Sequence, residues 1–157
     1  MALEPSLLIC DEAVSSLDVL IQAQVLNLFE RLRAELSLSY LFIAHDLALV
    51  KQVSDRVAVM YLGKLCEVGP GEAVYREPLH PYTRGLLGCV PSLTTETERL
   101  TAIPGTLPDP TRRPPGCSFA PRCQCAIPAC GAARPPMTML DADHATACIR
   151  ASEFAGA

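Results

Sequence analysis

The chain has 157 residues, of which half are hydrophobic and eight are cysteine, and its formal net charge is −4. This length allows one domain, or a small domain with an appended module. The acidic balance, without any run of basic residues, argues against a nucleic-acid partner, because phosphate binding depends on Lys and Arg. No basic leader of a signal peptide and no stretch of ~20 apolar residues is visible, so we expect a cytoplasmic protein.

Three segments near the start predict a β–α–β unit. Residues 6–10 and 39–44 are short apolar runs without alternation, as is typical of strands covered on both faces. Residues 19–36 between them carry apolar side chains every three to four positions, which predicts an amphipathic helix. Asp18 is placed to cap the first amides of this helix. The order predicts a right-handed unit with parallel strands, and therefore an α/β fold.

The residues that follow the two strands are the first candidate site. Asp11 and Glu12 follow the first strand and His45 follows the second, so all three should converge at one edge of the sheet. Phosphoryl transfer to water needs a bound cation, a group that orients the water and a sensor of the terminal phosphate. Two carboxylates and an imidazole suit these tasks. Without further context, however, two acids after a strand are more often solvent-exposed loop residues or helix caps. A histidine after a strand is more often structural.

The chain continues with short predicted elements: a helix at 47–54, strands at 57–61 and 65–68, and helices at 72–76 and 83–89. Asp46 is a candidate cap for the first of these helices. Gly69-Pro70-Gly71 is expected to break the pattern after the second strand. From Pro91 the composition changes, and five prolines fall within residues 103–115. Such a segment favours an extended linker.

Five of the eight cysteines crowd the end of the chain. Four of them follow the spacing C-x5-C-x6-C-x17-C: Cys117, Cys123, Cys130 and Cys148. Four thiolates drawn together can bind zinc or an iron–sulfur cluster. This spacing matches neither a common zinc ribbon nor a bacterial ferredoxin, so a metal site, disulfides and free thiols all stay open. We expect Cys125 to be a bystander, and we expect His144 to be structural rather than a substitute ligand.

The wider sequence resembles a known family. Residues 7–19 (Leu-Leu-Ile-Cys-Asp-Glu-Ala-Val-Ser-Ser-Leu-Asp-Val) resemble the Walker B motif and D-loop of ABC-type ATPases, and residues 42–47 (Phe-Ile-Ala-His-Asp-Leu) resemble their switch-histidine loop. Residues 79–87 (Leu-His-Pro-Tyr-Thr-Arg-Gly-Leu-Leu) and 114–123 (Pro-Pro-Gly-Cys-Ser-Phe-Ala-Pro-Arg-Cys) resemble the ATP-binding subunits of oligopeptide, dipeptide and nickel importers. Ala13 stands where many ABC ATPases have proline, a departure that peptide-importer relatives often share. The resemblance covers essentially the whole chain, but only about half of a family subunit.

The resemblance implies a fold in three parts. Residues 1–90 would be part of a P-loop NTPase (ABC-type) parallel sheet with helices, residues 91–116 a Pro-rich linker, and residues 117–157 a loop-dominated cysteine extension. The extension would hold a [4Fe-4S] cluster on Cys117, Cys123, Cys130 and Cys148, with zinc as the alternative. His80 and Tyr82 receive no chemical task.

The resemblance also implies roles at the nucleotide. Asp11 would lie in the magnesium shell of ATP, and Glu12 would be the general base. Asp18 would reach across an ATP-sandwich dimer, and His45 would contact the γ-phosphate. The implied partners are a second ATP-binding subunit, transmembrane permeases and, indirectly, an extracytoplasmic peptide-binding protein. The location would be peripheral, on the inner face of the cell membrane.

The 157 residues contain no P-loop (G-x-x-x-x-G-K-[ST]), signature motif or glutamine loop. Because the P-loop cradles the phosphates, the chain alone is expected neither to bind ATP tightly nor to hydrolyse it. Two alternatives are a non-enzymatic metal-binding or interaction module and a decayed gene fragment. A reading frame with a P-loop upstream of Met1 would favour the transporter. The cargo stays open between dipeptides, longer peptides and nickel complexes, with peptide favoured.

Overall fold

The computed structural model describes residues 5–89, 102–109, 111–141 and 143–155. The chain divides into two compact units, Met1–Val53 and Ser54–Ala157. This division falls after Val53, and the predicted bounds at residues 90 and 116 both lie within the second unit. Within the described ranges, no helix is both long and apolar enough to cross a membrane.

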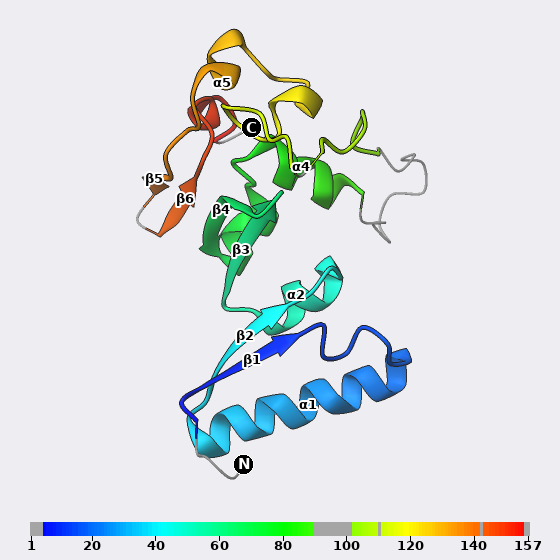
Figure 1. The fold of residues 1–157 in the computed structure, drawn as a ribbon. Coiled ribbons are helices and arrows are strands. Elements are labelled where there is room, and N and C mark those ends of the chain that lie inside the picture. The colour runs from blue at the N-terminus through cyan, green and yellow to red at the C-terminus, as the bar shows by residue number, and fades with distance from the viewer. Residues whose placement is uncertain (1–4, 90–101, 110, 142, 156–157) are drawn as a thin grey trace, which may run out of the picture. The chain divides into compact units, whose positions relative to one another are not determined.

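The first unit contains the predicted β–α–β arrangement (Figure 1). Its elements are β1 (Leu7–Asp11), α1 (Val19–Leu36), β2 (Ser39–Ile43) and α2 (Leu47–Val53). The two strands pair in parallel, from Leu7 opposite Ser39 to Asp11 opposite Ile43. Both predicted caps are confirmed, since Asp18 accepts from the amide of Ile21 at 3.0 Å and Asp46 accepts from the amide of Ala48 at 2.9 Å.

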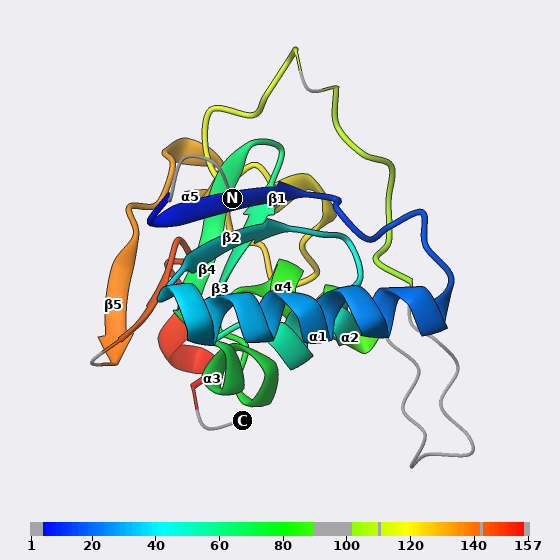
Figure 2. The same cartoon turned by 90° about the horizontal axis from the view of Figure 1, so that it is seen from below.

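One face of this small sheet is covered and the other is open. Phe29 of α1 lies against Tyr40 and Phe42 of β2, with ring centroids 5.4 and 5.5 Å apart, and Figure 2 shows α1 running alongside the strands. On the other face, Ile9 and Leu41 are opposite each other and 60% and 50% exposed. Within the described part of the first unit, no element packs on this second face, so the prediction of strands covered on both faces is not met by this unit itself.

The second unit is built on a four-stranded antiparallel sheet with the order β3-β4-β6-β5. Its elements in chain order are β3 (Arg56–Tyr61), β4 (Lys64–Pro70), α3 (Gly71–Arg76), α4 (Pro81–Gly88), the 3-10 turn Ala120–Arg122, α5 (Pro128–Ala132), β5 (Thr138–Asp141), β6 (His144–Thr146) and the 3-10 turn Ala151–Glu153. The β3–β4 hairpin confirms the sequence prediction. The sequence analysis did not predict the strands β5 and β6. These strands join residues far apart in the chain into one sheet (Figure 1). The described fold is thus mixed α/β, and its only parallel pair among the described strands is β1–β2.

The expected break at Gly69-Pro70-Gly71 comes later than predicted. Gly69 pairs with Val57 inside β4, and Pro70 ends the strand. Gly69 is needed at this place because a Cβ there would lie 2.7 Å from Cδ2 of His144 on the neighbouring strand. The glycine therefore permits a close approach of β4 and β6 rather than a turn.

An aromatic core holds the cysteine-rich end of the chain on the β3–β4 hairpin. Phe119 is buried with Tyr61 and Cys66, and its ring centroid lies 5.4 Å from that of Tyr61 and 5.3 Å from that of Tyr82. Arg122 donates to the carbonyl oxygens of Ile103 and Pro104 at 3.1 and 2.9 Å. The side chain of Arg122 thereby holds the backbone at Ile103 and Pro104, where the chain has no regular secondary structure.

Candidate functional sites

The end of the parallel pair brings Glu12 and His45 together. Oε1 of Glu12 lies 3.2 Å from Nδ1 of His45, and the two side chains are 55% and 71% exposed. An exposed pair of this kind adds little to stability. Its proximity follows from the parallel pairing, since β1 and β2 end at the same edge. The pair is therefore placed to act on something that approaches from solvent.

The backbone at Glu12 is in an unusual conformation for this residue. Its φ of 47° lies in the left-handed region, which side chains other than glycine and asparagine rarely adopt. The amide of Glu12 donates to the carbonyl of Ile43 at 2.9 Å, and its carbonyl accepts from the hydroxyl of Ser15 at 3.0 Å. These bonds hold the turn that follows β1. Strained backbone that is fixed in this way is common at functional sites.

The other two residues predicted for this site lie apart from the pair. A depression at the strand edge is bordered by Glu12, Ser15, Gln22, His45 and Asp46 among others, but not by Asp11 or Asp18. Asp11 is the exposed last residue of β1. Asp18 caps α1. The structure thus gathers Glu12 and His45 and leaves the two aspartates outside the depression.

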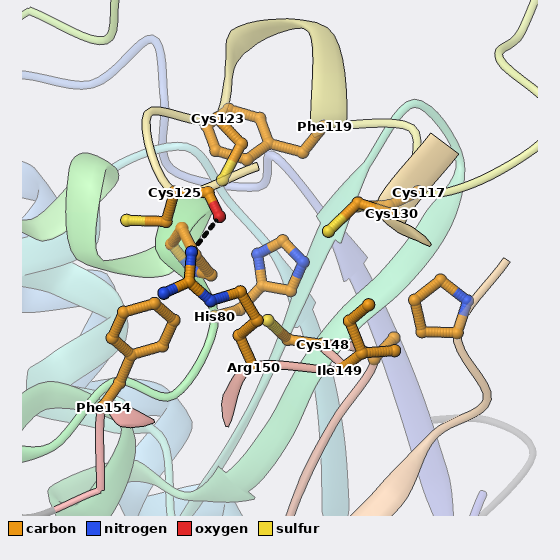
Figure 3. Close-up of a pocket in the computed structure, with 13 residues that line it drawn as sticks. His80, Cys117, Phe119, Cys123, Cys125, Cys130, Cys148, Ile149, Arg150 and Phe154 are labelled. Atoms are coloured by element: carbon orange, nitrogen blue, oxygen red, sulfur yellow. Dashed lines mark hydrogen bonds between the residues drawn. The ribbon is translucent and has the colours of Figure 1, made fainter. Parts of the chain in front are cut away.

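A second site lies wholly within residues 54–157. One cavity is lined by five cysteines and by His80, as Figure 3 shows; the cysteines are Cys117, Cys123, Cys125, Cys130 and Cys148. All are free thiols. As they stand, the described side chains form no group of three His, Cys, Asp or Glu that could hold a metal ion. The four predicted cysteines therefore share a cavity with Cys125, but their sulfur atoms are not drawn into a closed ligand set.

Burial keeps three of these thiols in their neutral form. It raises the pKa of Cys117 and of Cys123, and it raises the pKa of Cys148 to about 11, with the charges of neighbouring cysteines as a smaller cause. Thiolates crowded into one apolar cavity repel one another unless a cation neutralises them. The donor set therefore suits a thiophilic metal or cluster, which binds as the thiols lose their protons.

The local structure explains why these cysteines line one cavity. The amide of Cys117 donates to the carbonyl of Cys130 at 2.8 Å. This contact needs Gly116, because a Cβ at that position would lie 2.2 Å from the same carbonyl oxygen. On another side of the cavity, Nη1 of Arg150 donates to the carbonyl of Cys125 at 2.6 Å. One backbone hydrogen bond and one side-chain hydrogen bond to the backbone thus bring together segments that are far apart in sequence.

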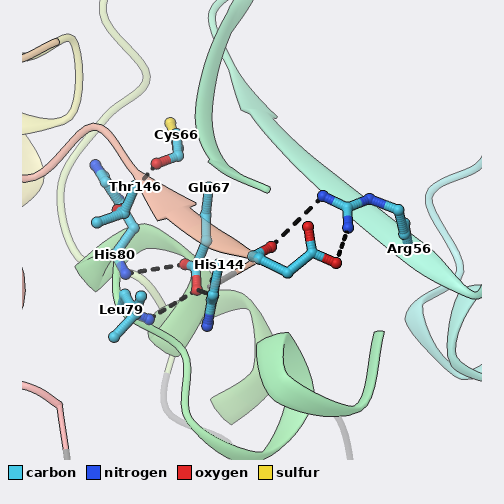
Figure 4. A network of polar contacts seen from close by, with 8 residues as sticks. Arg56, Cys66, Glu67, Leu79, His80, His144 and Thr146 are labelled. Carbon is cyan, nitrogen blue, oxygen red and sulfur yellow. Dashed lines mark hydrogen bonds and ion pairs between the residues drawn. The ribbon is translucent and has the colours of Figure 1, made fainter. Parts of the chain in front are cut away.

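A buried carboxylate that sequence reasoning missed supports the wall of the cavity (Figure 4). Glu67 of β4 is 0% exposed. Its Oε1 accepts from the amide of Leu79 at 2.8 Å and lies 2.7 Å from Nε2 of His144, and its Oε2 accepts from the amide of His80 at 2.9 Å. The structural role expected for His144 is confirmed by this contact. The sequence feature that could have revealed this role is the position of Glu67, an acidic residue inside a largely apolar strand.

Comparison with known proteins agrees with the motifs. Residues 66–130 match the sequence model of a family described as the C-terminal region of oligopeptide/dipeptide transporters. The oligopeptide transport ATP-binding protein OppF of Salmonella typhimurium is 49% identical over 155 residues, which cover 96% of this chain and 46% of that protein. A Brucella abortus protein named as a peptide import ATP-binding protein is also 49% identical, over 136 residues that cover 87% of this chain and 41% of that protein.

A third relative, named as a peptide import ATP-binding protein of Brucella ovis, is 45% identical over 157 residues and 46% of its own length. The chain thus spans less than half the length of these curated relatives. It matches them over most of its own residues. In sequence, the chain is therefore similar to the ATP-binding proteins of oligopeptide and peptide importers over most of its length.

Proposed function

We propose that the chain is part of the energy-coupling, ATP-hydrolysing subunit of an ABC importer for peptides. The observation that carries the proposal is the contact between Glu12 and His45 at the shared end of two parallel strands. The names of the relatives support ATP binding and peptide import. The open face of β1–β2 at Ile9 and Leu41 also supports it, because a larger subunit would cover these apolar side chains.

Glu12 and His45 suit two different tasks in the hydrolysis of ATP. Glu12 would accept a proton from the water that attacks the γ-phosphate, and His45 would contact that phosphate and orient Glu12 through their mutual contact. Asp11 and Asp18 are proposed to act at the magnesium ion and across the dimer of two ATP-binding subunits. Magnesium supplies charge neutralisation at the phosphates when it is bound. The permeases that these subunits would drive, and the peptide cargo, belong to the same proposal.

The test is a chimera in which this chain replaces the matching stretch of the Salmonella OppF protein. With Glu12→Gln, magnesium-dependent ATP hydrolysis should fall by about a hundredfold or more, because the general base is lost. Glu30→Gln, an exposed acid on α1, is the matched control and should leave the rate unchanged. His45→Ala should also lower the rate. A Glu12→Gln chimera that turns over at the rate of the control would refute the role of Glu12.

The cysteine cavity is proposed as the site of an iron–sulfur cluster, with zinc as the alternative. Cys117, Cys123, Cys130 and Cys148 would supply the thiolates, and their common cavity and soft donor atoms support this choice. The cluster would cross-link segments that are distant in sequence, in a region with few buried side chains of its own. Because the cavity involves only residues 54–157, it also favours the second candidate function, a metal-binding module. A chimera that binds metal but never hydrolyses ATP would support that second function.

A further inference from the structure

The turn after β1 carries a polar side chain beside Glu12 to which the proposed reaction gives no task. Ser15 borders the same depression as Glu12 and His45, and Figure 1 shows the segment that contains it between β1 and α1. The hydroxyl of Ser15 donates to the carbonyl oxygen of Glu12 at 3.0 Å. The serine therefore contacts the candidate general base through the backbone and not through the carboxylate.

The backbone of Glu12 is held from both sides. Its carbonyl oxygen accepts from the hydroxyl of Ser15 and also from the amide of Ser15, at 3.2 Å. A carbonyl oxygen has two lone pairs, so both bonds can form at once. On the other side, the amide of Glu12 donates to the carbonyl of Ile43 at 2.9 Å. These contacts fix the two peptide groups that flank Glu12, and so they hold its φ at 47°.

The hydroxyl of Ser15 matters because the backbone of Glu12 is strained. The left-handed region is disfavoured about 5- to 30-fold for a residue with a side chain. One hydrogen bond favours a folded arrangement by a net factor of about 2 to 13. The two factors are of similar size, so the loss of a single bond changes the balance. Because Ser15 is exposed and water competes for the same carbonyl, we expect a factor near the lower end, about threefold.

The backbone of Glu12 decides where its carboxylate lies. Val14, two residues later, is 6% exposed and packs with Leu26 and Leu49, so this end of the turn is anchored in the core. A change of φ at Glu12 therefore turns the Cα–Cβ bond of Glu12 relative to the end of β2. Such a turn would break the 3.2 Å contact between Oε1 of Glu12 and Nδ1 of His45.

We propose that Ser15 is a positioning residue for ATP hydrolysis: its hydroxyl holds the left-handed backbone of Glu12 and thereby keeps the Glu12 carboxylate beside His45. The catalytic part of this inference rests on the proposed function of Glu12 as general base. The geometric part needs neither ATP nor a partner. Since Ser15 acts through Glu12, its loss should lower the catalytic rate and leave the binding of ATP unchanged.

The geometric part is tested on the full chain by nuclear magnetic resonance. A positive φ brings the amide and α hydrogens of one residue close together, so Glu12 should give a strong Overhauser effect between them. A second effect should connect the side chain of Glu12 with the ring of His45. Both should weaken in Ser15→Ala and persist in Ser15→Thr, which keeps the hydroxyl. Unchanged effects in Ser15→Ala, or no strong effect at Glu12 in the unmodified chain, would overturn the proposal.

The matched control for this measurement is Ser16→Ala. Ser16 is exposed in the same turn and, within the described residues, donates no hydrogen bond to Glu12, so this variant should leave both effects unchanged. The contact between the rings of Phe29 and Tyr40 should persist in every variant, which shows that the unit is folded.

The catalytic part is tested in the chimera with the Salmonella OppF protein. Ser15→Ala should lower kcat about threefold at an unchanged KM for ATP, and Ser15→Thr should restore the rate. A slow Glu12→Gln chimera beside a Ser15→Ala chimera of full rate would leave the proposed function standing and overturn the role of Ser15. A Glu12→Gln chimera as fast as its Glu30→Gln control would overturn the proposed function, and the catalytic role of Ser15 with it.

Discussion

Replacing Glu67 by glutamine tests how the second unit is held together. The two oxygen atoms of Glu67 each accept from a different buried amide, Leu79 at 2.8 Å and His80 at 2.9 Å. Glutamine has a single oxygen, so in either orientation one of these two N–H groups faces an NH₂ group. His144 can adapt by changing its tautomer, but a peptide N–H cannot. The substitution therefore leaves at least one buried donor without an acceptor.

The expected cost is the desolvation of that donor, about 1–3 kcal/mol in the free energy of unfolding. The matched control is Glu72→Gln, because the side chain of Glu72 is 85% exposed and its contact with Arg76 lies on the surface. The control should change stability by less than about 0.5 kcal/mol. Urea unfolding of the full chain measures both variants. Hydrogen exchange of the Leu79 and His80 amides adds a local readout, expected to quicken about 30-fold for a loss near 2 kcal/mol.

The result that would refute this reasoning is equal stability of the two glutamine variants, with unchanged exchange at Leu79 and His80. It would mean that Glu67 does not anchor the segment before α4. The support that this segment gives to the cavity wall would then have to come from the aromatic core around Phe119 alone.

Three further predictions concern single positions. Burial raises the pKa of Cys66 to about 12, so on the order of one thiol in 10⁴ is ionised at pH 8. Iodoacetamide should then label Cys66 readily in denaturant and very slowly in the folded chain, where the rate should rise about tenfold per pH unit. Rapid labelling of the folded chain would contradict the burial of Cys66. Asp18→Ala should lower the free energy of unfolding of the first unit by ~1 kcal/mol, whereas Asp18→Asn should change it little. Equal stability of the two variants would show that the cap at Asp18 does not stabilise α1. Gly116→Ala should speed hydrogen exchange at the Cys117 amide. The control is Gly88→Ala, which should not change this exchange, because a Cβ at Gly88 would meet no atom within 4 Å. Unchanged exchange at Cys117 in Gly116→Ala would disprove the close approach of Gly116 to Cys130.

The first unit could be predicted closely from the sequence because its signals are local. The spacing of apolar residues and the Asp18 cap predicted α1 with its observed bounds. The parallel pairing followed from the order of the elements, and it brought Glu12 toward His45 as expected. The open face of the sheet could not be predicted, because an apolar strand looks the same whether or not a neighbour covers it.

The second unit depends on contacts between distant residues, which the sequence does not reveal. β6 is only three residues long and exists through pairing with β4. Likewise, the partner of Glu67 lies 77 positions away at His144. The cysteine spacing suggested four ligands, but it gave no sign that Cys125 and His80 border the same cavity. The role of His80 as the N-cap of α4 was missed because a histidine before proline carries no regular capping signal.

The cysteine site offers the most direct measurement on the chain itself. The full chain is purified anaerobically, and its iron, sulfide and zinc contents are determined together with its visible absorption. We predict a brown protein with about four iron atoms, lost in Cys130→Ala and kept in Cys89→Ala, since Cys89 does not line the cavity. A colourless chain free of zinc, or equal metal contents in the two variants, would contradict the assignment of the cavity as a metal site.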